Sequence, residues 1–325
     1  MPKICYTEKR FNAKSLTYIE TANKIIADYL AQGFTLTLRQ LYYQFVSRDI
    51  IPNTEHSYKN LGSLINDARL AGLIDWEHLE DRTRNVRQNS HWSSPSEIVE
   101  ACSQQFQHDK WKGQKYRPEV WIEKDALVGV ISGICGELDV PYFSCRGYTS
   151  ASEMWAGAMR LVKYKKSGQI PIVFHLGDHD PSGIDMTRDI QDRLDLADDL
   201  EQGMDKLTFT RGSVKMKRLA LNMDQVRQYN PPPNPAKSTD ARFAAYQEEH
   251  GDESWELDAL EPSVLVALVE EAVKGVRDQE AWNAAVKEEN HSKRELRAVA
   301  ENWTEALEHL EIVEEEDEED EDGPR

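Results

Sequence analysis

The chain has 325 residues, of which 39% are hydrophobic and 30% are charged. This length suits two or three domains, and the composition is that of a globular protein with room for hydrophobic cores. The longest apolar runs fall well short of the ~20 residues that span a bilayer, and the N-terminus lacks the apolar segment of a signal peptide. The four cysteines form no CxxC pair, so neither a zinc site nor a disulfide framework is indicated. We therefore expect a cytoplasmic protein that does not bind a membrane.

The net charge of −19 is spread unevenly along the chain. Residues 1–118 carry 16 basic and 13 acidic side chains, a net charge of +3. The net charge is −3 over residues 119–220, −10 over residues 221–310 and −9 over residues 311–325. The first third is therefore suited to meeting a polyanion, whereas the last third would repel one.

The first part of the chain shows the periodicity of amphipathic helices. Three are expected, over residues 14–32, 38–49 and 57–72. Gly33 ends the first helix, Thr35 or Thr37 caps the second, and Asn53 and Thr54 open the third.

A basic segment follows these helices. Residues 73–84 (LIDWEHLEDRTR) are expected to form a short strand or hairpin, and Arg82, Arg84 and Arg87 lie in or directly after it. Three short helices followed by a basic hairpin are typical of a winged helix-turn-helix, whose third helix lies in a DNA groove. The sequence predicts such a domain over residues 1–90. A plain helical bundle with a basic loop is the alternative.

Strands and helices alternate in the middle of the chain, after a predicted linker over residues 91–118 that contains a helix near 96–108. The expected strands are residues 120–122, 141–144, 170–176 and 207–210, and the expected helices are residues 126–138, 151–163 and 184–194. This alternation predicts an α/β domain over residues 119–220, with a parallel sheet and helices on both faces. In such sheets the active groups gather at the carboxyl ends of the strands.

The remainder of the chain is predicted to be helical. The prolines of residues 230–235 (NPPPNP) indicate a stiff loop, and helices are expected at about 239–249 and 263–310 within a C-terminal region spanning 221–310. Residues 311–325 form an acidic tail that we expect to be disordered. The tail either keeps the protein soluble or occupies a basic groove in place of a nucleic acid.

Three carboxylates directly follow two of the predicted strands. Glu123 follows residues 120–122, and Asp178 and Asp180 follow residues 170–176. If these strands are neighbours, the three side chains converge into a set of hard oxygen ligands suited to Mg²⁺, with Mn²⁺ as a substitute. Helix capping is the alternative role for all three. His179, between the aspartates, is expected to face solvent.

These segments resemble a known family. The pair VWIEKDAL and GDHDPSGID is similar to the two signature segments of the toprim domain, and within that group to the topoisomerase VI A subunit and its relatives that make meiotic double-strand breaks. The resemblance covers roughly residues 35–220. It implies that Glu123 and Asp178 hold the metal ion and that Asp180 lies near it.

The same family carries a nucleophilic tyrosine in a motif close to R-[DE]-[IL]-Y-Y. Residues 39–43 (RQLYY) match it except at Gln40, so the resemblance implies that Tyr43 is the nucleophile and Arg39 its partner. Helical geometry places Tyr42 on the apolar stripe, whereas Tyr43 is turned about 100° away with Arg39 one turn earlier on its face. We therefore expect an exposed phenol, which ionises near ~10 when free, beside a cation that helps it to ionise. Alternatively, both tyrosines pack in the domain core.

The resemblance implies a Mg²⁺-dependent enzyme that cleaves double-stranded DNA. Tyr43 would attack a backbone phosphate and become linked to a 5′ end, while Glu123 and Asp178 hold the metal ion and Lys124 neutralises charge. A homodimer would cut both strands, with the tyrosine of one protomer meeting the metal of the other. The candidate phosphate contacts are Lys59, Arg69, Arg82 and Arg84.

Other readings remain open. The chain has no GxxxxGK[ST] loop, so a complete topoisomerase cycle would need a separate ATPase subunit. The alternatives are a toprim nuclease that uses water, and a DNA-binding protein whose metal site is vestigial. The segment SWELDALEP, with Glu256 and Asp258, either approaches the metal or begins an ordinary helix.

Overall fold

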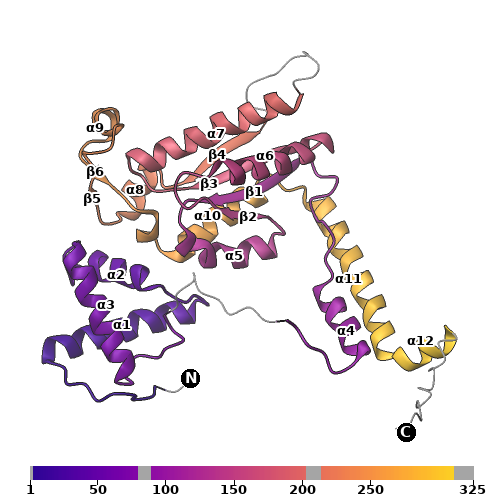
Figure 1. Ribbon diagram of the computed structural model, residues 1–325, viewed down its shortest axis with the longest axis horizontal. Helices are drawn as coiled ribbons and strands as arrows, with labels where there is room; N and C mark the ends of the chain where they lie inside the picture. The colour runs from indigo at the N-terminus through magenta and orange to yellow at the C-terminus, as the bar shows by residue number, and fades with distance from the viewer. Residues whose placement is uncertain (1–2, 80–88, 203–213, 311–325) are drawn as a thin grey trace, which may run out of the picture. The chain divides into compact units, whose positions relative to one another are not determined.

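The computed structural model describes residues 3–79, 89–202 and 214–310. The chain forms two compact units, Met1–Asn85 with Gly113–Arg277, and Val86–Lys112 with Asp278–Arg325 (Figure 1). The predicted linker over residues 91–118 is thus divided between them. Within the described ranges, no helix is both long and apolar enough to cross a bilayer.

Three helices form the N-terminal part of the first unit: α1 (Ala13–Ala31), α2 (Leu38–Ser47) and α3 (Glu55–Leu70). Each begins at a side-chain cap, supplied by Asn12, Thr37 and Thr54, and Thr37 forms a capping box with Gln40. The helices enclose a hydrophobic core that includes Ile25, Leu41, Phe45 and Ile65. The predicted helices are confirmed, with their boundaries shifted by one or two residues.

The predicted hairpin after α3 is only partly described. From residue 73 to Leu79 the chain contains no strand, and Leu79 makes a single bridge to Leu36. Arg82, Arg84 and Arg87 lie outside the described residues. The winged-helix assignment therefore stays a prediction.

A four-stranded parallel sheet forms the centre of the first unit. Its strands are β1 (Tyr116–Ile122), β2 (Tyr142–Ser144), β3 (Ile170–Leu176) and β4 (Lys215–Ala220), in the order β2-β1-β3-β4. The first three predicted strands are confirmed. The predicted strand over residues 207–210 lies outside the described residues, and β4 was not predicted. Because β1 and β3 are neighbours, with Ile122 opposite Leu176, the residues that follow them meet at one edge of the sheet.

Helices cover both faces of this sheet, as predicted (Figure 1). On one face, α6 (Ala151–Lys166) and α7 (Pro181–Gln202) pack over Trp121 and Val173. On the other, α5 (Val128–Glu137) follows the single turn η1 (Asp125–Leu127) and packs against α10 (Pro262–Lys274). The carboxyl edge of the sheet thus lies between two helical layers.

The chain returns to that edge after β4. The elements on this path are α8 (Met223–Tyr229), β5 (Asn234–Pro235), α9 (Phe243–His250), β6 (Glu253–Ser254) and the turn η2 (Leu257–Ala259). Strands β5 and β6 pair antiparallel, so residues 230–235 are partly held in a small ribbon. Ala259 joins the core of the N-terminal helices, and η2 packs against α2.

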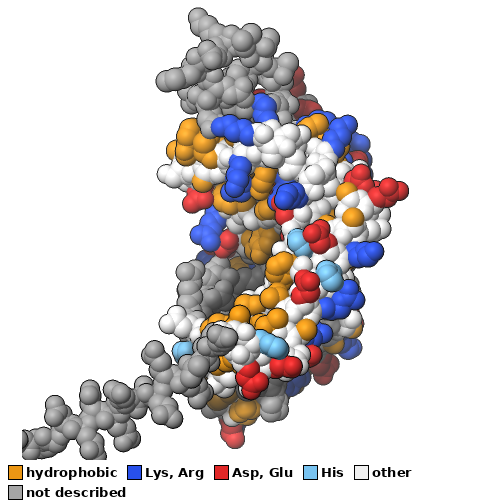
Figure 2. All heavy atoms as spheres, turned by 90° about the vertical axis from the view of Figure 1, so that its right-hand side faces the viewer, with side chains coloured by type: hydrophobic (Ala, Val, Ile, Leu, Met, Phe, Trp, Pro, Cys, Tyr) orange, Lys and Arg blue, Asp and Glu red, His pale blue; other side chains and the backbone are white. Residues whose placement is uncertain are grey.

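The second unit is built around a helical pair, in which α4 (Pro95–Gln105) packs against α11 (Gln279–Glu301), which is followed by α12 (Trp303–His309). The ammonium of Lys110 pairs with Glu289, and the rings of Trp111 and Trp282 lie 5.9 Å apart. Figure 2 shows basic and acidic side chains intermingled on the face that it presents. The described residues on that face therefore do not form a continuous field of one sign that would attract a polyanion over a distance.

Candidate functional site: a carboxylate cluster at the sheet edge

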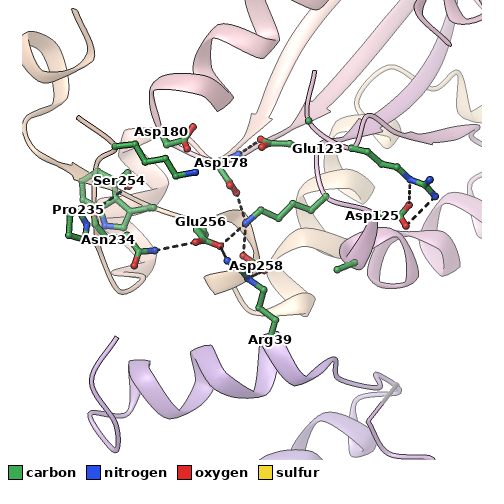
Figure 3. A pocket seen from close by; sticks show the side chains of 16 residues that line it. Arg39, Glu123, Asp125, Asp178, Asp180, Asn234, Pro235, Ser254, Glu256 and Asp258 are labelled. Carbon is green, nitrogen blue, oxygen red and sulfur yellow. Dashed lines mark hydrogen bonds and ion pairs between the residues drawn. The ribbon is translucent and has the colours of Figure 1, made fainter. Parts of the chain in front are cut away.

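A cavity of about 740 Å³ lies at the carboxyl edge of the parallel sheet. Side chains reach it from the loop after β1, the loop after β3, the path around β5 and β6, and α2 (Figure 3). Six acidic and four basic residues line it, namely Glu123, Asp125, Asp178, Asp180, Glu256 and Asp258, with Arg39, Lys124, Arg146 and Lys237. The lining thus has a formal charge of −2 when all ten side chains are ionised.

Glu123 and Asp178 are brought together by the pairing of β1 with β3. Oε2 of Glu123 accepts a hydrogen bond from the backbone N–H of Asp178 at 2.8 Å. Burial raises the pKa of Asp178 to about 7, although the ammonium of Lys124 opposes the shift. Burial also raises the pKa of Glu123, against the hydrogen bond from the amide of Asp178. The expected convergence of these two residues is confirmed.

Asp180 lies in the same cavity but is turned toward a helix start. Its Oδ1 accepts hydrogen bonds from the backbone N–H of Gly183 at 2.6 Å and from Oγ of Ser182 at 2.9 Å. Asp180 therefore caps the beginning of α7 in this conformation, which is the alternative role that the sequence left open.

Lys124 occupies the centre of the cluster. Its ammonium nitrogen lies 3.0 Å from Asp178 Oδ1, 2.8 Å from Glu256 Oε2 and 2.8 Å from Asp258 Oδ1 (Figure 3). Burial alone would lower the pKa of Lys124, but the three carboxylates outweigh it and hold the pKa well above its ordinary value. A permanently charged cation thus lies where three carboxylates converge.

The loop that carries Asp178 also places Glu256 and Asp258. The backbone of His179 pairs with that of Trp255 through hydrogen bonds of 2.8 and 2.9 Å, and the N–H of Leu257 donates to Asp178 Oδ1 at 2.7 Å. The segment SWELDALEP therefore approaches the cluster, one of the two readings that its sequence allowed.

His179 does not face solvent, which corrects the expectation from its sequence position. It is buried, and its ring nitrogen lies 2.9 Å from the hydroxyl of Tyr246. Its ring also packs against His250 and Trp255. The pairing with Trp255 turns the side chain inward, because the loop and the segment before η2 lie against each other there.

Arg39 joins the cluster from α2. Its guanidinium pairs with Glu256 and, through Nε, with Asp258 Oδ2 at 3.0 Å. Nη2 of the same group lies 3.4 Å from the hydroxyl of Tyr43, so the expected Arg39–Tyr43 neighbourhood is confirmed. Burial raises the pKa of Glu256, but Lys124 and Arg39 outweigh this and lower the pKa to about 2.

Tyr43 is not an exposed phenol, contrary to the helical-stripe prediction. Its side chain is buried with 3% exposure, and its hydroxyl faces Arg39 at the edge of the cluster. Burial raises the pKa of Tyr43, Asp258 and Glu256 raise it further, and Arg39 only partly opposes them. Residues from the segment around η2 cover the face of α2 that the stripe left free, so this face is also internal.

A smaller cavity of about 230 Å³ lies beside Tyr43. Arg39, Asn234 and Glu256 line both this cavity and the larger one. The ion pair between Arg39 and Glu256 thus separates the cavity beside Tyr43 from the cavity of the carboxylate cluster.

Of the four residues predicted to contact phosphate, two have partners within the protein and two lie outside the described residues. Lys59 pairs with Glu55 at 2.7 Å on the surface of α3. Arg69 donates to the carbonyls of Trp76 and Leu79, and its guanidinium lies over the Trp76 ring, so it holds the chain after α3 in place. Arg82 and Arg84 lie outside the described residues.

The side chains of the cluster can be compared with the ligands that a divalent metal ion requires. Across the described ranges, no three carboxylate, imidazole or thiol side chains are spaced as the ligands of one ion. The donor chemistry nevertheless suits a hard cation, since Asp178, Glu256 and Asp258 already surround an ammonium. A metal ion fits this donor set if the ammonium of Lys124 withdraws.

Two residues near the site were not found from the sequence. Arg218 on β4 donates to the loop that carries Asp178, and Asn234 contacts Glu256. A lone arginine in a strand and an asparagine among prolines carry no functional signal by themselves. Comparison with models of known protein families and with curated protein sequences finds no match.

Proposed function

We propose that this protein is a Mg²⁺-dependent enzyme that cleaves the backbone of DNA at the carboxylate cluster. The observation that carries the proposal is the convergence of Asp178, Glu256 and Asp258 on one cation position at the carboxyl edge of a parallel sheet. The resemblance of the segments around Glu123 and Asp178 to toprim signatures supports the same function. Under this proposal the first unit combines a winged-helix domain with a toprim domain.

The residues of the cluster have separate tasks in the proposed reaction. By resemblance, Glu123 and Asp178 would hold the metal ion, with Asp180 near it, and a bound ion would supply positive charge for the phosphate and the leaving oxygen. Lys124 and Arg39 exchange carboxylate partners for phosphate oxygens when DNA enters. This exchange keeps the two cations paired throughout.

Tyr43 is the proposed nucleophile. Its phenolic oxygen forms a bond to phosphorus, the bond from phosphorus to the 3′ oxygen breaks, and a 5′-phosphotyrosyl link remains. The phenol loses its proton and the released 3′ oxygen gains one, so protons balance. Because Tyr43 is buried, the reaction requires the contact between Arg39 and Glu256 to open. By resemblance, double-stranded DNA, a homodimeric partner and a separate ATPase subunit are part of this proposal.

A specific observation favours a second candidate, a toprim nuclease that uses water. Tyr43 is buried and its pKa is raised, so its phenol is a poor nucleophile in this conformation. Tyr43 does not line the larger cavity, so a water nucleophile there would not need α2 to rearrange. In that reaction the oxygen of water forms the bond to phosphorus and the bond from phosphorus to one backbone oxygen breaks. The water loses a proton, the released oxygen gains one, and no covalent link to protein results.

One experiment separates the candidates. Supercoiled plasmid is incubated with the protein and Mg²⁺ or Mn²⁺, and both nicking and protein attached to DNA 5′ ends are measured. Tyr43→Phe should abolish attachment, whereas Tyr18→Phe, a half-buried tyrosine of the same helical core, should not. Cleavage without attachment identifies water as the nucleophile. Cleavage by Asp178→Ala at the wild-type rate would show that the cluster is not the active site.

A further inference from the structure

The guanidinium of Arg218 lies beneath the loop that carries Asp178 and Asp180. Arg218 extends from β4, and its donors are directed to oxygen atoms at both ends of that loop. The acceptors are the carbonyls of Gly177 (3.0 Å), Asp178, Gly183 (2.9 Å) and Leu221 (3.3 Å) and the hydroxyl of Thr187 (2.6 Å). A planar group with five N–H donors can serve several acceptors at once, more than the three donors of a lysine ammonium allow.

These bonds fix which way the loop's peptide groups point. The carbonyls of Gly177 and Asp178 face Arg218, while the N–H of Asp178 donates to Glu123 at 2.8 Å. The side chain of Asp178 is then held toward Lys124. The orientation of two carboxylates thus depends on one partly buried guanidinium.

Two glycines make room for this arrangement. A Cβ on Gly183 would lie 2.4 Å from the carbonyl oxygen of Asp178, and a Cβ on Gly177 would lie 2.9 Å from Glu123 Oε2 and 3.4 Å from Arg218 Nη1. Larger residues at these positions would displace the groups that Arg218 holds. The loop and the guanidinium therefore fit each other as a pair.

The positive charge of Arg218 is favourable beside the carboxylates of the cluster. Burial lowers the pKa of Arg218 to about 10, and Glu123, Asp178 and Asp180 limit the decrease. Arg218 stays charged at neutral pH, although its hydrogen bonds go to backbone carbonyls and a hydroxyl rather than to carboxylates. Its positive charge therefore offsets part of the negative charge of the cluster without forming ion pairs that would turn the carboxylates away from the cavity.

We propose that Arg218 is a positioning residue that holds the loop 177–183 in the conformation required for divalent-cation binding. This inference rests on the proposed function. Arg218 is not among the described residues that line the larger cavity, so it acts through Glu123 and Asp178 rather than on the substrate. Residues that orient metal ligands in this way typically change metal affinity by about 10–100-fold when replaced.

The test compares Arg218→Met and Arg218→Lys with Arg160→Met. Arg160 is a matched control, because its guanidinium makes two bonds of 2.7 and 2.8 Å to the buried Glu119 of the same sheet and does not contact the loop. Three quantities are measured well below the unfolding temperature of each variant: amide hydrogen exchange over residues 177–183, binding of Mg²⁺ alone by calorimetry, and plasmid cleavage.

Arg218→Met should speed exchange in the loop and weaken Mg²⁺ binding by about 10-fold or more. Arg218→Lys, which keeps the charge but offers three donors, should be intermediate, and Arg160→Met should leave both quantities at the wild-type level. If Arg218→Met does not fold, Arg218→Lys alone supplies the comparison.

Two outcomes overturn the inference: unchanged loop exchange in the Arg218 variants, or loosened loops that bind Mg²⁺ with wild-type affinity. A wild-type protein that binds no Mg²⁺ and cuts no DNA would instead overturn the proposed function. In that case the exchange data still decide whether Arg218 holds the loop.

Discussion

Replacing Lys124 by methionine tests the central feature of the cluster. Methionine keeps most of the volume of the side chain but removes the ammonium that contacts Asp178, Glu256 and Asp258 within 3.0 Å. Removing one partner of a buried ion pair costs about 3–5 kcal/mol. Because Arg39 still pairs with Glu256 and Asp258, we expect the lower end, about 3 kcal/mol of unfolding free energy.

Mg²⁺ should then restore much of this loss. In Lys124→Met the three carboxylates lack their internal cation, so a divalent ion meets no competing ammonium. A ligand present at about 100 times its dissociation constant adds about 2.7 kcal/mol to the stability of the form that binds it. We expect a gain of this order for the variant at millimolar Mg²⁺ and a smaller gain for the wild type, in which the ammonium must first withdraw.

The assay is urea unfolding followed by circular dichroism, with and without MgCl₂ at matched ionic strength. Lys59→Met removes a solvent-exposed ion pair with Glu55 and serves as the control, with an expected midpoint equal to that of wild type. The reasoning fails if Lys124→Met is as stable as wild type without Mg²⁺. It also fails if Mg²⁺ stabilises the variant and the wild type equally.

Three further substitutions have definite expected outcomes. Gly183→Ala should destabilise the protein by about 2 kcal/mol and reduce cleavage, because its Cβ would lie 2.4 Å from the carbonyl oxygen of Asp178; unfolding and plasmid assays measure this. Gly133→Ala, on an exposed helical position with no atom within 4 Å of the new Cβ, should stabilise by about 0.5–1 kcal/mol in the same unfolding assay. In the second unit, burial raises the pKa of Glu289, but its bonds with Lys110 and Lys293 outweigh burial and lower the pKa to about 2, below the ordinary value of 4.5. The resulting stability is present above pH 4.5 and is lost as the pH falls toward 2. In Glu289→Gln the free energy of unfolding, followed by tryptophan fluorescence, should therefore vary with pH by about 1–2 kcal/mol less in that window than in the wild type.

Much of the α/β fold was predictable because local patterns and tertiary structure agree there. The strand over residues 170–176 was predicted at its observed boundaries, since it is a continuous apolar run buried on both faces of the sheet. Thr37 and Thr54 marked the starts of α2 and α3 through capping chemistry. By contrast, β4 alternates exposed lysines with partly buried residues at the edge of the sheet, so it lacks such a run.

The burial of Tyr43 could not be predicted from helical periodicity. A stripe identifies the face of α2 that packs on its sequence neighbours, α1 and α3. The opposite face is covered by the segment around η2, where Gln44 Nε2 donates to Glu261 at 2.9 Å and Ala259 enters the core. More than 200 residues separate these partners in the sequence, so no local pattern records their contact.

The carboxylate cluster was likewise only partly predictable from the sequence. Two of its strands were recognisable from the segments around Glu123 and Asp178, and their pairing followed from the topology of a parallel sheet. Glu256 arrives by a different route, through the backbone pairing of His179 with Trp255. The ammonium of Lys124 can reach three carboxylates only because this third segment is present. Of the three metal ligands that the sequence predicts, Asp178 is the one that contacts the ammonium of Lys124, together with Glu256 and Asp258 from this third segment. Under the proposed function, metal binding at Asp178 therefore becomes a competition with Lys124 rather than the filling of an empty site.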